Sequence, residues 1–499
     1  MFRDHTPVVI EEFNGWWQRG SNDSCPLDHF QQADNIQYFY SGFQTRDPID
    51  KYQNVGSPLG NIVRVFMYTM QTQESLLVLV QGGDIYHVKS ATVVLGPILS
   101  IATMTDFNAV SWAGRAYITP FFTDSVDNYE KGLQNQFLYV YKGDGTAARK
   151  AAGDPPTGAI TPANGAAGAT DFGLHVFGVV FESDTGWLSA PGGFASFTTS
   201  ANLSVSFTTV PVSLQAHIVK RHIVATKVII GFDGNLDGYQ FFFVPNATIN
   251  DNVTTVLNNI SFYDIDLLDD ASHLIDNFSS IPAGVGLTTY HGRLVLTTTY
   301  TDISVAYASE AGEPEAINQV DGVMVVPLDG KPLTNCQEYR DVLYLYKQTR
   351  TVGYSDNQDV PATWQMFIVD EGTGCSVHGI ATVLDSGGVN VDYLLIADIN
   401  GLMLFDGSYQ FPPISYKIES YWFTLNKNDF EFVQVANDSL KKKLWITQPN
   451  DRHQLIHMDY NEGLSPDKVK WARWIFDAKI SSICLINIDD LIIGALAPA

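Results

Sequence analysis

The sequence is poor in basic residues, and it has no long apolar run. Its 499 residues include 29 Lys and Arg against 54 Asp and Glu, which gives a formal net charge of −25. A nucleic-acid-binding surface needs cations that replace the counterions of phosphate, so this balance argues against sequence-specific DNA or RNA binding. No stretch approaches the about 18 apolar residues of a membrane-spanning helix, so no stable membrane insertion is expected.

Cysteine is scarce as well. The four cysteines, Cys25, Cys336, Cys375 and Cys484, are far apart and form no CxxC pair. This spacing indicates neither a zinc site nor a disulfide scaffold. The N-terminal residues lack the apolar segment of a secretory signal, and free thiols fit synthesis and assembly in a reducing cytoplasm.

The motifs of common enzyme classes are missing too. Neither GxxxxGK[ST] nor a strand-linked GxGxxG is present, which argues against nucleotide binding. The GxSxG nucleophile elbow and the HExxH zinc motif are also absent. We therefore assign no catalytic, cofactor-binding or metal-binding residue, and we expect a protein that is not an enzyme and carries no cofactor.

What the sequence does have is a strong strand signal. It contains 23 Tyr, 29 Phe and 9 Trp, and aromatic side chains pack well on pleated sheets. Short apolar runs bounded by Gly, Asp and Asn predict hairpins, because such residues favour tight turns. The clearest predicted hairpins pair residues 75–80 with 85–88, residues 393–397 with 402–405, and residues 483–486 with 491–493.

These hairpins repeat along the chain. Residues 112–118 resemble residues 290–296, and residues 339–345 form a third version without the glycine. From residue 282 onward the hairpins return roughly every 40 to 50 residues, which is the spacing of four-stranded propeller blades. We therefore predict an all-β fold, a β-propeller of six or seven blades with an inserted β-sandwich domain.

The composition divides the chain into four parts. Residues 1–142 are predicted to hold an N-terminal segment and the first blades, and residues 271–499 the remaining blades. Residues 143–171 are rich in Gly, Ala and Pro, and we interpret them as a flexible linker because few of their side chains reward ordering. Residues 172–270 show strand patterning of their own and are predicted to form the inserted sandwich.

Two local patterns imitate metal sites. Residues 233–238 resemble the start of an EF-hand loop, but Val244 occupies the position of the bidentate glutamate, so a hairpin turn is favoured. His453 and His457 lie four residues apart, which on a strand places both on one face. Only Asp459 is near as a third ligand, and we predict no metal site there.

Carboxylate pairs and tryptophans are the residues from which a glycan-cleaving site would be built. Glycoside hydrolysis needs two carboxylates at close range. The sialidase-type Asp box is not matched, because residues 355–359 precede Trp364 at the wrong spacing. Glu310, Glu313 and Glu315 form a local cluster, which we interpret as a solvated loop because a glycine and a proline interrupt it. Exposed tryptophans can stack on sugars, but we assign the tryptophans of this chain to packing. They include Trp16, Trp17, Trp471 and Trp474.

A set of short motifs resembles a known family. The N-terminal segments 13–15, 25–30, 33–36 and 42–49 follow the order "P-x-D-H/Y … x-N-I … G-x-x-T-R-x-G-I", which is similar to the opening of tail nozzle and hub propellers of short-tailed bacteriophages. Pro48 stands where these proteins usually have glycine. In the second half, the segments found in the same order as in these proteins are residues 361–364, 374–376, 401–407 and 414–418. Residues 185–191 resemble the fibronectin type III-like modules inserted in many phage structural proteins.

The resemblance implies a structural role in a virion tail. It implies a homo-oligomeric ring, with a hexamer favoured, that lies below the portal and adaptor proteins and anchors tail fibre proteins. Genome DNA would pass through the ring's channel without sequence-specific binding, and an acidic lining would repel phosphate, although acidity also serves solubility. The protein would be made in the host cytoplasm. The alternatives are a receptor- or fibre-binding tail propeller and a glycan hydrolase.

Overall fold

The computed structural model describes most of the chain and is nearly all β. The described residues are 29, 32–39, 42–45, 59–70, 73–121, 136–236, 238–300, 302–327, 329–385, 391–425, 427, 430, 433–448, 453–486 and 490–496. The predictions that concern residues 13–17, Cys25 and residues 46–49 lie outside this set. Within it, α2 (Glu419–Trp422) is a single short α-helix, and no helix is long and apolar enough to cross a membrane.

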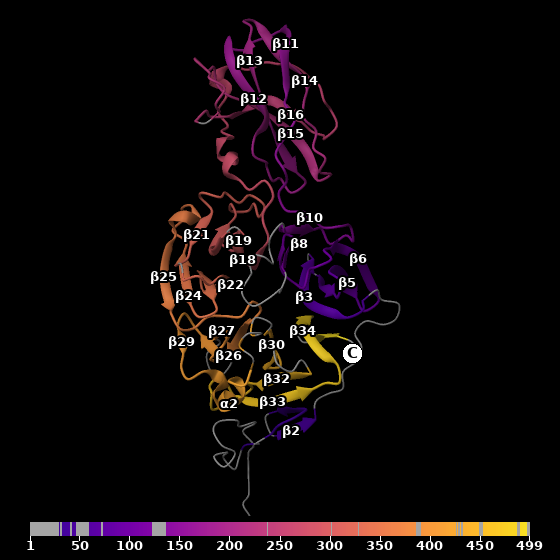
Figure 1. Ribbon diagram of the computed structural model, residues 1–499, viewed down its shortest axis with the longest axis vertical. Coiled ribbons are helices and arrows are strands. Elements are labelled where there is room, and N and C mark those ends of the chain that lie inside the picture. The colour runs from indigo at the N-terminus through magenta and orange to yellow at the C-terminus, as the bar shows by residue number, and fades with distance from the viewer. Residues whose placement is uncertain are drawn as a thin grey trace, which may run out of the picture.

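The protein is a β-propeller, as the hairpin repeat predicts. In the described residues, the ring consists of six antiparallel four-stranded sheets and one two-stranded sheet (Figure 1). The first sheet contains β3 (Ile62–Met70), β4 (Gln73–Val80), β5 (Asp84–Ser90) and β6 (Val93–Ser100). The second contains β7 (Asp106–Trp112), β8 (Arg115–Phe121), β9 (Tyr139–Tyr141) and β10 (Arg149–Lys150). The third contains β18 (Gly284–Tyr290), β19 (Arg293–Thr299), β20 (Asp302–Ala308) and β21 (Val323–Val325).

The remaining sheets complete the ring. The fourth sheet contains β22 (Leu333–Tyr339), β23 (Val342–Lys347), β24 (Thr351–Ser355) and β25 (Gln365–Asp370), and the fifth contains β26 (Ile380–Asp385), β27 (Val391–Asp398), β28 (Gly401–Phe405) and β29 (Tyr409–Gln410). The sixth contains β30 (Val435–Asp438), β31 (Lys443–Thr447), β32 (Gln454–Asp459) and β33 (Lys470–Ile475). The last sheet pairs β34 (Lys479–Ile486) with β35 (Asp490–Leu496). Short 3-10 helices are η4 (Pro361–Thr363) and η5 (Ile414–Ile418).

The three similar segments noted in the sequence occupy equivalent places. Each spans the turn between the first and second strands of its sheet. Both central residues of each turn have a positive φ, which matches the twist of the flanking strands in a two-residue hairpin. The paired φ values are 47° and 76° at Ala113 and Gly114, 45° and 71° at His291 and Gly292, and 47° and 67° at Arg340 and Asp341.

Segments from the two ends of the chain meet in the ring. The Ser482 hydroxyl on β34 accepts a hydrogen bond from the Val65 amide on β3 at 3.0 Å, so the last sheet packs against the first. The strands β1 (Ile36–Phe39) and β2 (Gly42–Thr45) pair with each other. Just before β1, the amide of Asn35 donates to the carbonyl of Arg473 at 2.6 Å, which places this N-terminal segment beside β33 (Figure 1).

Residues between β10 and β18 form a two-sheet unit that projects from one side of the ring (Figure 1). One sheet has the order β11-β14-β17 and the other β13-β12-β15-β16. Phe177 on β12 contacts Phe207 on β14 edge to face, with centroids 5.3 Å apart, so apolar side chains fill the space between the sheets. Its membership of the fibronectin class stays a prediction. The elements are β11 (Thr161–Ala167), β12 (Gly173–Ser183), β13 (Gly192–Thr199), β14 (Leu203–Thr209), β15 (Ile218–Ala225), β16 (Phe242–Ile249), β17 (Leu257–Ile260), η2 (Asp264–Asp266) and η3 (Ser272–Asp276).

The interpretation of residues 143–171 as a flexible linker is wrong for part of the segment. This stretch contains both β10 and β11, and β11 pairs with β14. The small residues that suggested a linker instead allow close approach, because a Cβ on Gly168 would lie 2.9 Å from the Ser204 amide nitrogen. Backbone pairing with a neighbouring strand thus orders a segment whose own side chains bury little.

Candidate functional site

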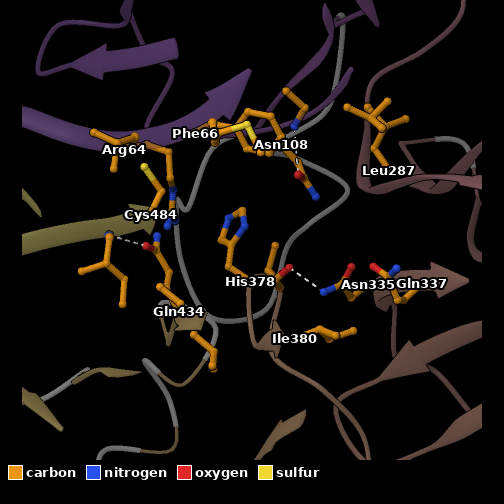
Figure 2. Close-up of a pocket in the computed structure, with 18 of the residues that line it drawn as sticks. Arg64, Phe66, Asn108, Leu287, Asn335, Gln337, His378, Ile380, Gln434 and Cys484 are labelled. Atoms are coloured by element: carbon orange, nitrogen blue, oxygen red, sulfur yellow. Dashed lines mark hydrogen bonds between the residues drawn. The ribbon is translucent and has the colours of Figure 1, made fainter. Parts of the chain in front are cut away.

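The inner strands of the seven sheets surround a cavity of about 530 Å³ (Figure 2). The first strand of each sheet, β3, β7, β18, β22, β30 and β34, contributes to its wall, together with residues at the start of β26. Because these side chains come from every sheet, the cavity marks the axis of the propeller. Central cavities of this kind are a common location for binding sites, and we take it as the candidate site.

A buried ion pair joins the first two sheets beside this cavity. Arg64 on β3 donates from Nε to Oδ1 of Asp106 on β7 at 2.5 Å, and its Nη2 donates to Oδ2 of the same carboxylate. Arg64 and Asp106 are 4% and 3% exposed, so the pair is shielded from water. The His378 Nε2 lies 3.3 Å from Asp106 Oδ2 and links the segment before β26 to the pair across the ring.

The electrostatics of this group fix its protonation. Burial by itself raises the pKa of Asp106, but Arg64 and His378 outweigh it and hold the pKa well below the usual range. Burial and the charge of Arg64 together lower the pKa of His378, against the opposing effect of Asp106. At neutral pH the group is therefore an Arg–Asp ion pair beside an uncharged imidazole, whose Nε2–H donates to the carboxylate.

Two asparagines brace neighbouring sheets in the same way. Asn108 on β7 donates from Nδ2 to the carbonyl of Val285 on β18 at 3.3 Å. Asn335 on β22 donates from Nδ2 to the carbonyl of Val377, which precedes β26, at 2.9 Å. Each asparagine Oδ1 also accepts the amide of the next residue in its own strand. Their polar groups are thus used in holding the ring together.

Two buried hydrogen-bond donors of residues that line the cavity lack an acceptor among the described residues. Gln434 lies just before β30, and its Oε1 accepts hydrogen bonds from the Ile483 amide at 2.9 Å and from the Ser482 hydroxyl at 3.0 Å. Its Nε2 has no hydrogen-bond partner among the described residues, and neither does Nη1 of Arg64. Gln434 is 4% exposed, so neither donor reaches bulk water freely. Both nitrogens have less than 1 Å² of accessible surface, so they lie against packed protein and do not face the open space of the cavity.

The titratable side chains in the described lining are Arg64, His378, Cys336 and Cys484. None of the described residues that line the cavity is Asp or Glu. Cys336 and Cys484 face it, and burial raises the pKa of both thiols, that of Cys484 to about 12. A thiol held protonated at neutral pH is a poor nucleophile.

The histidines considered as metal ligands lie apart from this cavity. His457 on β32 is fully buried between Trp445 and Trp474, with ring centroids 5.5 and 4.9 Å away. His453 precedes β32 and contacts the Phe476 carbonyl at 3.3 Å. Among the described residues, no group of three His, Cys, Asp or Glu side chains is arranged to hold a metal ion.

The interpretation of Glu310, Glu313 and Glu315 as a solvated loop is wrong for Glu315. That side chain is 1% exposed, and Arg149 on β10 binds it with two hydrogen bonds of 2.8 and 3.0 Å. Arg149 also donates to Asp184, between β12 and β13, at 2.9 Å. A cation that is distant in the sequence therefore stabilises a carboxylate that the local glycine and proline place in a turn. We call Arg149, Asp184 and Glu315 the junction clamp, because they join two sheets of the ring to the two-sheet unit.

Other candidates have structural roles. Asp233 accepts the Asn235 amide at 2.9 Å in the long connection between β15 and β16. Trp364 is buried and contacts Tyr290 edge to face at 5.3 Å. Trp471 is fully buried, and Trp474 is 8% exposed, so the assignment of these two tryptophans to packing is confirmed.

The two-sheet unit carries a groove of its own. This groove has a volume of about 560 Å³ and is lined by residues of β12, β15 and β16 and of the segment that follows η2. Leu268, which is 80% exposed, lies at the groove together with the carboxylates Glu182, Asp266 and Asp269.

Sequence reasoning missed every residue of the central site. The residues of this site belong to no known motif and lie far apart in the sequence: Arg64, Asp106, His378 and Gln434. One signal was present: each lies in or next to the first strand of a repeat, where apolar residues are otherwise expected. A charged or amide side chain in such a strand has to find a partner across the propeller axis.

Comparison with known proteins adds fold neighbours. No protein-family profile and no curated protein matches the chain. Among solved structures, Hsv2 of Kluyveromyces lactis is 12% identical with a TM-score of 0.29, covering 83% of this chain and 97% of its own. Apo AztD from Citrobacter koseri is 10% identical with a TM-score of 0.33, covering 87% and 89%. YCF48 bound to D1 peptide is 10% identical with a TM-score of 0.26, covering 89% and 97%.

Proposed function

We propose that this protein is a structural subunit of the tail of a short-tailed bacteriophage, in a nozzle or hub ring below the portal and adaptor. The observation that carries the proposal is the ordered set of short motifs at both ends of a chain that folds as a β-propeller, the fold that the resemblance implies. In this role the subunit extends the DNA channel, helps to retain and deliver the genome, and anchors other tail parts.

The charge of the chain supports this role. A channel that passes DNA quickly must not hold its phosphates, and a net charge of −25 repels them. Sequence-specific binding would instead need clusters of Arg and Lys aimed at base edges. The acidic surface thus fits a wall along which the genome slides.

The propeller axis supports a channel formed between subunits. The links from Arg64 to Asp106 and from Asp106 to His378 cross the space beside the central cavity, and the asparagine braces close the ring further. The axis is thus lined by side chains that hold neighbouring sheets together. The genome path therefore belongs to a ring of several copies of the chain, with a hexamer favoured by the resemblance.

Cryo-electron microscopy of the purified virion tests the proposal. We expect a ring of density for this chain around the genome channel below the portal. A short tag inserted at Gly234 in the two-sheet unit, compared with one at Gly407 in the β28–β29 turn, would place the two parts, since a side chain at either glycine meets no neighbour within 4 Å. A protein that stays monomeric and never enters virions would refute the role.

The groove of the two-sheet unit is the proposed attachment point for another tail protein. Replacing Leu268 with Asp removes an exposed apolar side chain from the groove and adds a charge beside Glu182, Asp266 and Asp269, so we expect loss of that partner while the ring still assembles. Leu440→Asp is the matched control, because Leu440 is 70% exposed in the turn between β30 and β31. Quantitative mass spectrometry of mutant virions measures the partner. An equal partner content in both variants would contradict attachment at this groove.

A glycan hydrolase is the less favoured alternative. Its mechanism needs a pair of carboxylates at the substrate, and among the described residues none lines the central cavity. Hydrolysis of host polysaccharide by the purified protein, abolished by one carboxylate substitution, would favour the hydrolase over the structural role.

A further inference from the structure

Among the described residues, the outer strand of each four-stranded sheet in the ring has one edge without a neighbouring strand in its sheet. Every second residue of an edge strand directs its backbone N–H and C=O away from the sheet, so a long open edge can pair with another chain. Three of these outer strands are too short for such pairing, because β10 and β29 have two residues each and β21 has three.

Two longer outer strands, β6 and β33, are protected in other ways. Pro97 lies within β6, and a proline has no N–H to offer to a further strand. The amide of Ala148 also donates to the Ile98 carbonyl at 2.7 Å, so the segment before β10 already bonds to this strand. On β33, the Arg473 amide donates to the Ala33 carbonyl at 2.8 Å, and the N-terminal segment thereby covers this edge.

The outer strand β25 has none of these protections. It has six residues without a proline or a basic residue, and no described strand pairs with its outer edge. Its pairing with β24 is regular from Gln365 to Ile368, and Figure 1 shows it at the outer margin of the ring. Phe367 and Ile368 are 38% and 49% exposed, whereas the described side chains of β35 in the two-stranded sheet are partly or fully buried. β25 is therefore a long apolar edge that nothing in the described chain covers.

The side chains of β25 leave its backbone accessible. The Phe367 ring lies over Gly353 of β24, where a Cβ would overlap the ring, so the ring extends inward across its own sheet. On the opposite face, Met366 packs against the apolar cluster that contains Trp364. Ile368 follows on that face, because side chains alternate along a strand, and it stays half exposed. An added strand would thus meet open backbone groups and an apolar side chain.

We propose that β25 forms a contact between two copies of this chain, in which the two β25 strands pair antiparallel about a two-fold axis and join two four-stranded sheets into one continuous sheet. A two-fold axis perpendicular to the sheet places the central residue of one copy opposite the same residue of the other. With Phe367 at the centre, Ile368 of each copy lies opposite Met366 of the other, and apolar cross-strand pairs stabilise a sheet. Residues 365–369 carry no charge, so no like charges face one another there.

A two-fold contact closes on itself, so it joins free subunits in pairs, and a cyclic ring of subunits needs other surfaces. The proposal therefore does not depend on the role of the protein in a virion. A second copy supplies a strand of matching length and apolar character, and it is present wherever the chain itself is.

Analytical ultracentrifugation of the purified full chain tests the contact, at a salt concentration that screens the repulsion between two chains of net charge −25. We expect a dimer that dissociates on dilution. Ile368→Lys puts a charge on the open edge, as natural edge strands do to avoid pairing, so this variant should stay monomeric. Val93→Lys is the matched control and should keep the dimer, because Val93 is 42% exposed on the outer strand β6.

Two further measurements locate the contact on the chain. Directly opposed Cα atoms of an antiparallel pair lie about 4.5–5.5 Å apart, within the range of a disulfide, so Phe367→Cys should form a cross-linked dimer under mild oxidation. Phe411→Cys is the control, because Phe411 is 65% exposed just after β29, and it should not cross-link. In the unmodified chain, hydrogen exchange should slow in peptides that cover β25 as the dimer forms.

A purified chain that stays monomeric at every concentration would overturn the proposal, and this is also the result expected if only a different protein pairs with the edge. A dimer in which β25 exchanges as fast as in the monomer would overturn it too, because the contact would then lie elsewhere. Since the exchange experiment uses the unmodified chain, it gives an answer even if a variant fails to fold.

Discussion

The junction clamp should be the strongest single link between the ring and the two-sheet unit. Replacing Arg149 with Met keeps the length and apolar stem of the side chain but leaves Glu315 as a buried carboxylate without its cation. Removing one partner of a buried ion pair costs about 3–5 kcal/mol. Glu315 retains the hydrogen bond from the Ala152 amide at 2.7 Å, which places the expected loss near the lower value.

Hydrogen exchange followed by mass spectrometry is the suitable assay, because a chain with several units has no single unfolding free energy. A local loss of about 3 kcal/mol corresponds to roughly a hundredfold faster exchange, which we expect in peptides that cover β10, β12 and the segment around Glu315. Arg350→Met is the control. Arg350 lies 3.5 Å from Asp329 and 3.8 Å from Glu371 at a more open site, so its loss should stay below about 1 kcal/mol.

A double variant separates charge from packing. Adding Glu315→Gln to Arg149→Met removes the unpaired charge, so part of the protection should return. If the double variant exchanges as fast as the single one, the lost packing of the arginine stem explains the effect. If Arg149→Met changes exchange no more than Arg350→Met does, water reaches Glu315 and the reasoning fails.

Two further predictions concern buried positions. His457 is neutral when folded because burial lowers its pKa to about 3, whereas the unfolded imidazole titrates near 6.5, so stability should fall as the pH drops below about 6.5 toward 3. His457→Phe should flatten that slope in urea unfolding between pH 8 and pH 5, and an unchanged slope would show that His457 is not its source. Gly168→Ala should lower the free energy of unfolding by about 1–3 kcal/mol, because the new Cβ would lie 2.9 Å from the Ser204 amide nitrogen. Gly158→Ala is the control in the same chemical denaturation assay, because the nearest atom to its new Cβ is 4.0 Å away. Equal stability of the two glycine variants would mean that β11 moves away from β14 at little cost.

The hairpins were predictable because each is a local signal. Residues 75–80 and 85–88 carry their own strand pattern and turn, and they form β4 and β5 as expected. The same holds for β27 with β28 and for β34 with β35. The spacing of these hairpins then predicts the propeller, since such sheets bury their faces only by stacking on one another.

The central site and the clamp were not predictable for the opposite reason. Arg64 and Asp106 belong to different sheets, and Glu315 meets Arg149 from 166 positions away. Their local surroundings indicate an exposed or irregular position, and only the closed ring brings the partners together. The strand β11 was missed in a similar way, because its hydrogen bonds come from β14 and its own composition is that of a loop.

The contact of β34 with β3 has a consequence for biosynthesis. Residues near position 62 leave the ribosome before Ser482, whose hydroxyl accepts the Val65 amide in the folded chain. The first sheet thus lacks this contact until β34 has been made, while the two-sheet unit can fold as soon as its residues have emerged, since its contacts lie within about a quarter of the chain. Until then the apolar side chains of Val65 and Val78, which pack in one cluster with Ile486, stay uncovered, so closure soon after synthesis protects the nascent chain from aggregation. Any surface that needs the closed ring, including the lining of the central cavity, therefore forms only after this last step.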